Sequence, residues 1–110
     1  MKTKKDVIDF CKTFPNVFED YPFGDDSWAA MRRLDSRHGF AWIFERNGKI
    51  WVNFKAEPMW GEFLRDTYQS VIPAYHMNKT HWNSLILDGS VPREEIENMI
   101  KESYNLCAKK

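Results

Sequence analysis

Residues 40–55 read FAWIFERNGKIWVNFK, two runs of alternating residues joined by Asn47 and Gly48. A two-residue type I′ turn requires a positive φ at both central positions, and Asn-Gly tolerates this best. The stretch therefore predicts a β-hairpin in which Arg46 lies opposite Lys49. One face of the hairpin is mostly aliphatic and suits packing beneath helices. The other face is mostly aromatic and pairs Phe44 with Trp51, Trp42 with Asn53, and Phe40 with Lys55.

The segments on either side of the hairpin predict the rest of a single domain that spans residues 1–110. Thr3 and Asp6 form a capping-box pattern before a helix at 4–14, and residues 28–34 alternate as a strand. The remaining predicted elements are a helix at 57–68, a strand at 80–87, and a helix that begins at Pro92 and ends near Cys107. This order predicts an α+β domain, an antiparallel sheet with the terminal helices packed on one face.

The charge is balanced overall but uneven along the chain. Sixteen cationic and sixteen acidic residues give a formal net charge of zero, which argues against strong non-specific attraction to DNA or to an anionic membrane. Residues 28–55 carry six cationic side chains against two acidic ones, whereas 57–67 and 92–107 each have a net excess of two acidic residues. An anion-binding surface is therefore expected in residues 28–55.

The two cysteines, Cys11 and Cys107, lie near opposite ends of the chain and fit no metal-binding spacing. Both fall on apolar positions of predicted helices. This favours buried free thiols over the alternative, a disulfide that joins the terminal helices. The first residues lack the apolar core of a secretion signal, and no apolar run is long enough to span a membrane. We therefore expect a cytoplasmic protein without membrane association.

The stretch AYHMNKTHWNSL at 74–85 is a candidate for metal binding or catalysis. His76 and His81 are five residues apart, a spacing that suits neither one helix face nor one strand face, and no cysteine assists them. No serine lies in a nucleophile-elbow motif, and the glycines form no phosphate loop. The sequence thus predicts no metal site, no cofactor and no catalytic residue. An enzyme with a polar cleft around the two histidines is the least favoured of three hypotheses.

The same stretch is better explained as a turn that enters the last strand. Tyr75, Met77 and Trp82 supply apolar anchors for the turn, and the side chain of Asn78 can bond to the local backbone. Lys79 is then the residue expected to face outward.

The two favoured hypotheses use different surfaces. In the first, the domain binds DNA, with cations at the phosphates and polar residues adding hydrogen bonds. Its candidate residues are Arg32, Arg33, Lys49, Lys55, His76, Asn78, Lys79 and His81. In the second, the domain presents the aromatic face of the sheet to a protein partner. Its candidate residues are Phe40, Trp42, Phe44 and Trp51, unless the final segment of the chain or a dimer partner covers these rings. Under either hypothesis we expect a monomer or a weak homodimer.

Motifs through most of the chain resemble the MmcQ/YjbR family of small bacterial proteins. They are the YPFG sequence at 21–24, Lys55, Leu64, Arg65, the block PAYHMNK at 73–79 with His81 and Trp82, the LDG sequence at 87–89, Ser103 and Tyr104. The resemblance implies a fold like that of CyaY, the bacterial frataxin, and a DNA-binding protein with a "double-wing" motif. It does not imply the iron handling of frataxin, because residues 3–12 carry lysines and lack a dense acidic ridge.

Overall fold

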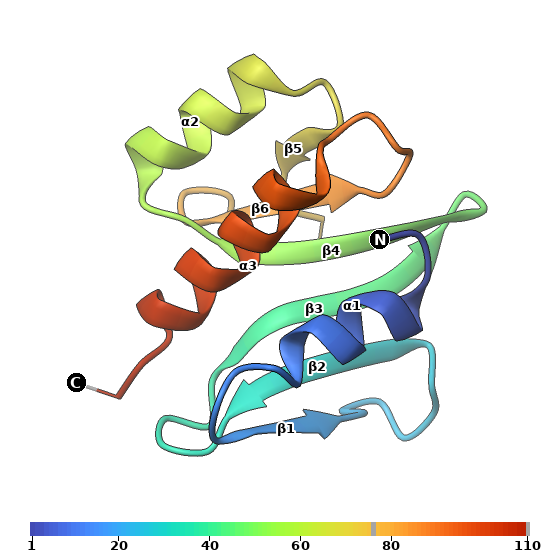
Figure 1. Cartoon of the computed structure of the whole chain (residues 1–110), viewed down its shortest axis with the longest axis vertical. Helices are drawn as coiled ribbons and strands as arrows, with labels where there is room; N and C mark the ends of the chain where they lie inside the picture. The colour runs from blue at the N-terminus through green and yellow to red at the C-terminus, as the bar shows by residue number, and fades with distance from the viewer. Residues whose placement is uncertain (76, 110) are drawn as a thin grey trace.

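The structure is a computed structural model that describes residues 1–75 and 77–109. Within these residues the chain forms three helices and six strands, drawn in Figure 1. Their bounds are α1 Lys4–Cys11, β1 Val17–Asp20, β2 Trp28–Arg33, β3 Gly39–Arg46, β4 Lys49–Lys55, α2 Pro58–Thr67, β5 Val71–Pro73, β6 Trp82–Ile86 and α3 Arg93–Leu106. The predicted α+β architecture is confirmed.

The strands form one antiparallel sheet in the order β1-β2-β3-β4-β6-β5. The predicted hairpin joins β3 to β4, and its turn residues Asn47 and Gly48 have φ values of 54° and 74°. The register from Arg46 opposite Lys49 onward is also as predicted. The sequence prediction missed β1 and β5. Both are edge strands, where Pro73 at the end of β5 interrupts no interior ladder.

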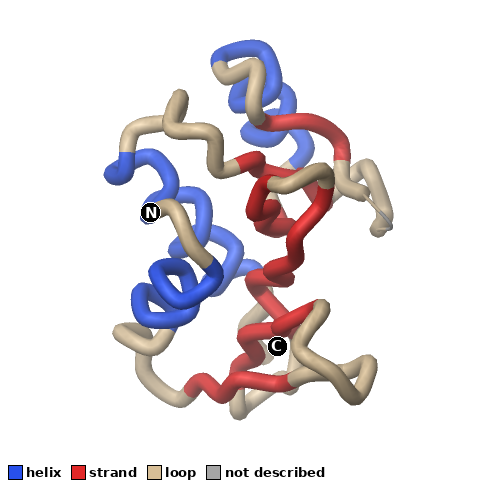
Figure 2. The backbone as a smooth tube through the Cα atoms, turned by 90° about the vertical axis from the view of Figure 1, so that its right-hand side faces the viewer, coloured by secondary structure: helices blue, strands red, loops and turns tan. Residues whose placement is uncertain are grey.

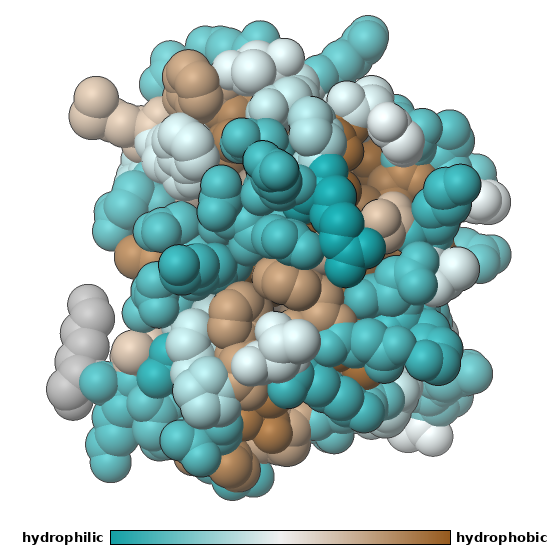
Figure 3. All heavy atoms as spheres, viewed as in Figure 1, coloured by the Kyte–Doolittle hydropathy of each residue, from teal (hydrophilic) through white to brown (hydrophobic). Residues whose placement is uncertain are grey.

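Helices cover one face of the sheet. The Thr3 hydroxyl accepts from the Asp6 amide and the Asp6 carboxylate accepts from the Thr3 amide, both at 3.1 Å, so the predicted capping box begins α1. α1 and α3 pack on this face, and α2 packs beside β5 (Figure 2). In Figure 3, hydrophilic side chains dominate this side, and hydrophobic ones gather between α1 and α3. The core beneath includes Val7, Met31, Ile43, Val52, Leu85, Met99 and Ile100.

The two thiols lie in this core. Cys11 and Cys107 are buried and free, as predicted. Burial raises the pKa of the Cys11 thiol to about 12 and also raises the pKa of Cys107. Both side chains are therefore protonated and inert at neutral pH.

A bulge in β3 changes where one predicted aromatic side chain points. Arg32 pairs with Gly39 while the residue before Arg32 pairs with Ala41, so Phe40 is an extra residue in the ladder. The ring of Phe40 is fully buried and lies edge-on to Tyr104 of α3, with 5.3 Å between ring centroids. The prediction that Phe40 lies on the aromatic face of the hairpin is therefore wrong. Phe40 belongs to the core beneath the helices.

The strands β3 and β4 separate at this same end. The two-residue turn makes Arg46 and Lys49 a hydrogen-bonded pair, and alternation along the ladder then predicts a direct bond from the Lys55 amide to the Phe40 carbonyl. Instead, the Ser103 hydroxyl of α3 accepts from the Lys55 amide at 2.8 Å and donates to the Phe40 carbonyl at 2.7 Å. A buried hydroxyl thus replaces the predicted direct pairing of Phe40 with Lys55.

The opposite face of the sheet is partly covered by the segment that follows β5. The Tyr75 ring packs on Phe44 and Trp51, with centroid distances of 5.7 and 6.1 Å. Two buried polar side chains hold the Tyr75 backbone: the Asn53 amide donates to its carbonyl and the Ser84 hydroxyl accepts from its N–H, both at 2.9 Å. Ser84 also donates to Asn53 at 2.5 Å, so the network is closed. Trp28 also stacks on Phe44, with 4.0 Å between ring centroids, and Phe44 and Trp51 are only 2% and 5% exposed.

Candidate nucleic-acid interface

Two adjoining pockets of about 440 and 380 Å³ lie where β4 ends beside the C-terminal end of α3. Lys55, Leu106 and Lys109 line both pockets, while His38 lines one and His81 lines the other. We call the surface formed by these five residues the Lys55 groove. It brings together two lysines and two histidines from four separate parts of the chain.

The antiparallel order of the strands explains this gathering. The start of β3, the end of β4 and the start of β6 all lie at one end of the sheet (Figure 1). His38 immediately precedes β3, Lys55 ends β4, and His81 immediately precedes β6. The Ala56 amide donates to the His81 carbonyl at 2.8 Å, which extends the β4–β6 ladder by one bond and fixes the His81 backbone beside the groove.

Among residues 1–75 and 77–109, no ion pair neutralises the charges of the two groove lysines. Asp35 and Glu57 also line the pockets. Ion pairs in the described part of the chain involve the cations Lys5, Lys12, Arg32, Arg33 and Arg93. Lys55 and Lys109 are not among them. Their ammonium groups therefore remain able to meet an anion from solution.

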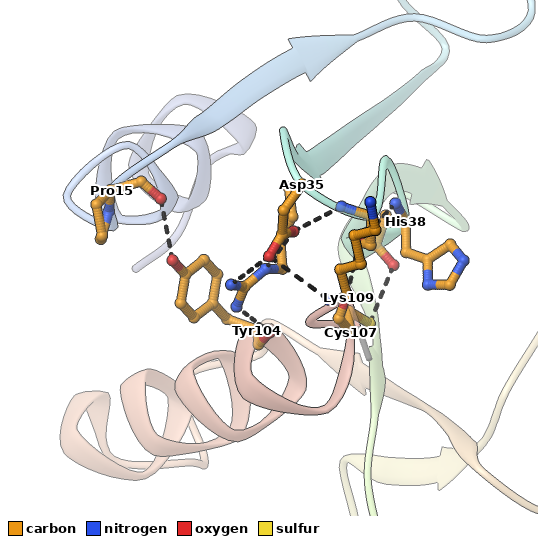
Figure 4. A network of polar contacts seen from close by, with 9 residues as sticks. Pro15, Asp35, His38, Tyr104, Cys107 and Lys109 are labelled. Carbon is orange, nitrogen blue, oxygen red and sulfur yellow. Dashed lines mark hydrogen bonds and ion pairs between the residues drawn. The ribbon is translucent and has the colours of Figure 1, made fainter.

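The loop between β2 and β3 forms one wall of the groove and is tied to the end of α3 (Figure 4). Arg33 donates to the Tyr104 carbonyl at 2.9 Å and its guanidinium lies 4.0 Å from the centre of the Tyr104 ring. The Ser36 hydroxyl donates to the Cys107 carbonyl at 2.6 Å. These donors satisfy carbonyl groups at the helix end, where a cation also interacts favourably with the helix dipole. The imidazole of His38 points away from this network.

Both arginines predicted to bind DNA are paired with carboxylates. Arg33 donates to both oxygens of Asp35 at 3.0 Å, and this hydrogen bonding lowers the pKa of Asp35 to about 2. Arg32 donates to Asp20 at 2.7 Å, and its guanidinium lies 5.1 Å from the centre of the Trp42 ring. Arg33 therefore binds a carbonyl group at the C-terminal end of α3, and a neighbouring carboxylate partly compensates the charge of each arginine.

Lys49 lies away from the groove. It begins β4 next to the hairpin turn, at the opposite end of the strand from Lys55. Near this end, hydrogen bonds from Ser70 and Ser90 lower the pKa of Asp88 to about 2, and the charge of Lys49 makes a smaller contribution in the same direction. The structure thus separates two lysines that the sequence prediction placed on one basic segment.

The turn before β6 has the local structure that the sequence predicts. The Asn78 side-chain oxygen accepts from the Thr80 amide at 2.8 Å and from the His81 amide at 3.4 Å. Lys79 is exposed, as predicted. His76, another predicted contact residue, lies outside the described residues.

The aromatic face does not form the exposed surface that the protein-partner hypothesis requires. Phe40 lies in the helix-covered core, and Phe44 and Trp51 lie beneath Tyr75. Trp42 alone among the four predicted residues remains partly exposed. The segment after β5 covers these rings, whereas the sequence analysis named the final segment of the chain or a dimer partner as the alternative cover.

The groove residues offer N–H donors and positive charge, which is the chemistry that binds phosphate oxygens. Sequence reasoning identified Lys55 and His81 but missed His38 and Lys109. The local spacing of His38 and Lys109 carries no signal, because only the strand order and the docking of α3 bring them to Lys55. Among residues 1–75 and 77–109, no three His, Cys, Asp or Glu side chains are grouped as a metal site.

None of the helices described here combines the length and the apolar character of a membrane span.

Comparison with known proteins supports the resemblance found in the sequence. The uncharacterised protein YjbR of Escherichia coli K12 is 28% identical over 102 residues, which cover 93% of this chain and 84% of that protein. The uncharacterised protein YyaQ of Bacillus subtilis 168 is also 28% identical, with 96% and 98% of the two chains covered. A crystal structure of Deinococcus radiodurans protein DR2400 has a TM-score of 0.90 and 33% identity, and covers 100% of this chain and 81% of that one. The YjbR family model matches residues 12–106, which run from the end of α1 through α3 and include four of the five groove residues. The chain therefore belongs to the YjbR family.

Proposed function

We propose that this protein is a non-enzymatic, cytoplasmic DNA-binding protein that contacts the phosphate chain through the Lys55 groove. One observation carries the proposal. Lys55 and Lys109 line adjoining pockets between His38 and His81, and neither lysine is ion-paired in the described part of the chain.

The groove supports contact with the backbone of DNA more than recognition of bases. Ammonium and imidazole N–H groups at its walls can donate to phosphate oxygens, and Leu106 with the aliphatic stems of the lysines offers apolar contact for sugars. The exposed Lys79, in the turn just before His81, can extend the contact along the chain of phosphates. We therefore expect binding that is largely independent of base sequence.

The zero net charge of the protein limits the strength of this binding and makes its salt dependence a sharp test. Each phosphate neutralised by a cation contributes about 0.9 to the slope of log K against log salt concentration. Three such contacts would weaken binding roughly 40-fold between about 50 and 200 mM salt. Measurable binding is thus expected at low ionic strength.

The test is fluorescence anisotropy of a labelled DNA duplex of about 20 base pairs, titrated with protein at about 20 mM salt and then at higher salt. Lys55→Ala and Lys109→Ala should each weaken binding and reduce the salt slope by about one contact. Lys49→Ala is the matched control, because it removes the same charge from the same strand at the end remote from the groove. Absence of wild-type binding at low salt would refute the proposal, as would equal losses for Lys49→Ala and Lys55→Ala.

A further inference from the structure

Arg37 has an unusual backbone conformation in the loop that forms one wall of the groove. Its φ of 64° lies in the left-handed region, which side chains other than glycine and asparagine rarely adopt. Hydrogen bonds on both sides hold it there. The Arg37 amide donates to the Arg33 carbonyl at 2.9 Å, and the Arg32 guanidinium donates to the Arg37 carbonyl at 3.0 Å. The loop therefore fixes an arginine where glycine or asparagine would be less strained.

The charge of Arg37 is not compensated as those of its neighbours are. Arg32 and Arg33 are paired with Asp20 and Asp35, whereas Arg37 is in none of the ion pairs formed by residues 1–75 and 77–109. Its guanidinium lies 5.0 Å from the centre of the Phe18 ring, and the residue is exposed. Stacking on an aromatic ring orients the guanidinium while leaving its N–H groups able to donate to an anion.

The position of Arg37 relates it to the groove. The residues on either side of it, Ser36 and His38, both line the larger pocket. Phe18 pairs with Arg32, whose side chain lies against Trp42 on the face of the sheet opposite the helices. Arg37 thus lies between two residues that line the groove pocket, and its guanidinium lies over Phe18 of the edge strand β1.

From these observations we propose that Arg37 is a phosphate-contact residue that continues the path of the DNA backbone beyond the Lys55 groove. This inference rests on the proposed function. Strained residues in exposed loops often mark functional sites, and here the strained residue lies between two residues that line the pocket of Lys55 and Lys109. The bidentate geometry of arginine suits a phosphate group better than that of any other side chain.

The experiment compares Arg37→Asn and Arg37→Lys with wild type in the same duplex titration. Asparagine tolerates the left-handed conformation, so Arg37→Asn should keep the wild-type Tm while it weakens DNA binding roughly fivefold to tenfold and lowers the salt slope by about 0.9. Arg37→Lys should keep the salt slope, because the charge remains. Should Arg37→Asn fold poorly, Arg37→Gly provides the same charge removal at a conformation that glycine adopts freely.

The outcomes separate the two proposals. Unchanged affinity and slope in Arg37→Asn, together with weakened binding by Lys55→Ala, would overturn the role of Arg37 and leave the proposed function standing. Failure of the wild-type protein to bind at low salt would overturn both. A salt slope that falls as much in Arg37→Lys as in Arg37→Asn would also overturn the inference, because a cation that contacts a phosphate must preserve the slope when its charge is kept.

Discussion

The Ser103 hydroxyl should make a large contribution to stability, because it satisfies two buried backbone groups at once. Ser103 is fully buried, accepts from the Lys55 amide and donates to the Phe40 carbonyl. In Ser103→Ala both groups lose their partner. Each unpaired buried group costs about 1–3 kcal/mol, so we expect the free energy of unfolding to fall by about 2–4 kcal/mol after partial relaxation. This is a large fraction of the roughly 5–15 kcal/mol typical of a whole domain, and it corresponds to a fall in Tm of roughly 10–20 °C.

Urea unfolding followed by tryptophan fluorescence measures this loss, and hydrogen exchange of the Lys55 amide locates it. Thr67→Ala is the matched control, because the Thr67 hydroxyl also bonds a backbone carbonyl, that of Phe63, but at an exposed position. We expect it to cost less than about 0.5 kcal/mol. A loss below about 1 kcal/mol in Ser103→Ala, with the Lys55 amide still protected, would refute the reasoning. It would show that β3 and β4 can close and form the direct ladder bond.

Two further predictions concern acid stability and thiol reactivity. Arg33 lowers the pKa of Asp35 from 3.8 to about 2, so the contribution of the Asp35 carboxylate to folding stability is full above its unfolded pKa and is lost as the pH falls toward 2. In urea unfolding, wild type should therefore lose more stability than Asp35→Asn between pH 5 and pH 3. Equal losses would contradict the pairing of Asp35 with Arg33. Because Cys11 and Cys107 are buried with raised pKa values, neither thiol should react with a disulfide reagent until the protein unfolds, and rapid reaction of the native protein would show that the core opens there.

The hairpin shows what the sequence determines locally. Asn47 and Gly48 set the turn, and the two-residue turn sets the register, so the pairing of β3 with β4 could be predicted residue by residue. The capping box of α1 and the bonding of Asn78 in its turn were predictable for the same reason. In each case the interacting groups are only a few residues apart.

The parts that sequence reasoning missed depend on distant segments. β1 exists because it pairs with β2, and the short sequence of β1 carries little alternation of its own. The bulge at Phe40 turns the ring toward Tyr104, a residue of the last helix. The role of Arg33 could not be read from its basic surroundings, because its partner carbonyl at Tyr104 is 71 residues away. The cationic residues of segment 28–55 are consequently divided among the end of α3, the hairpin turn, the groove and the neighbourhood of β1.

The bridge through Ser103 also bears on the order in which the chain folds. The β3–β4 hairpin is joined by a local turn, whereas the contacts of Ser103 span 48 and 63 residues. Local contacts form quickly, and contacts of long sequence separation form late because closing the intervening loop costs entropy. On a ribosome, the hairpin can therefore form before α3 is synthesised, but its open end and the side of the Phe40 ring that meets Tyr104 stay uncovered until the last helix docks. We expect docking of α3 to be the late step of folding, and the nascent chain before that step to be the form most prone to aggregate.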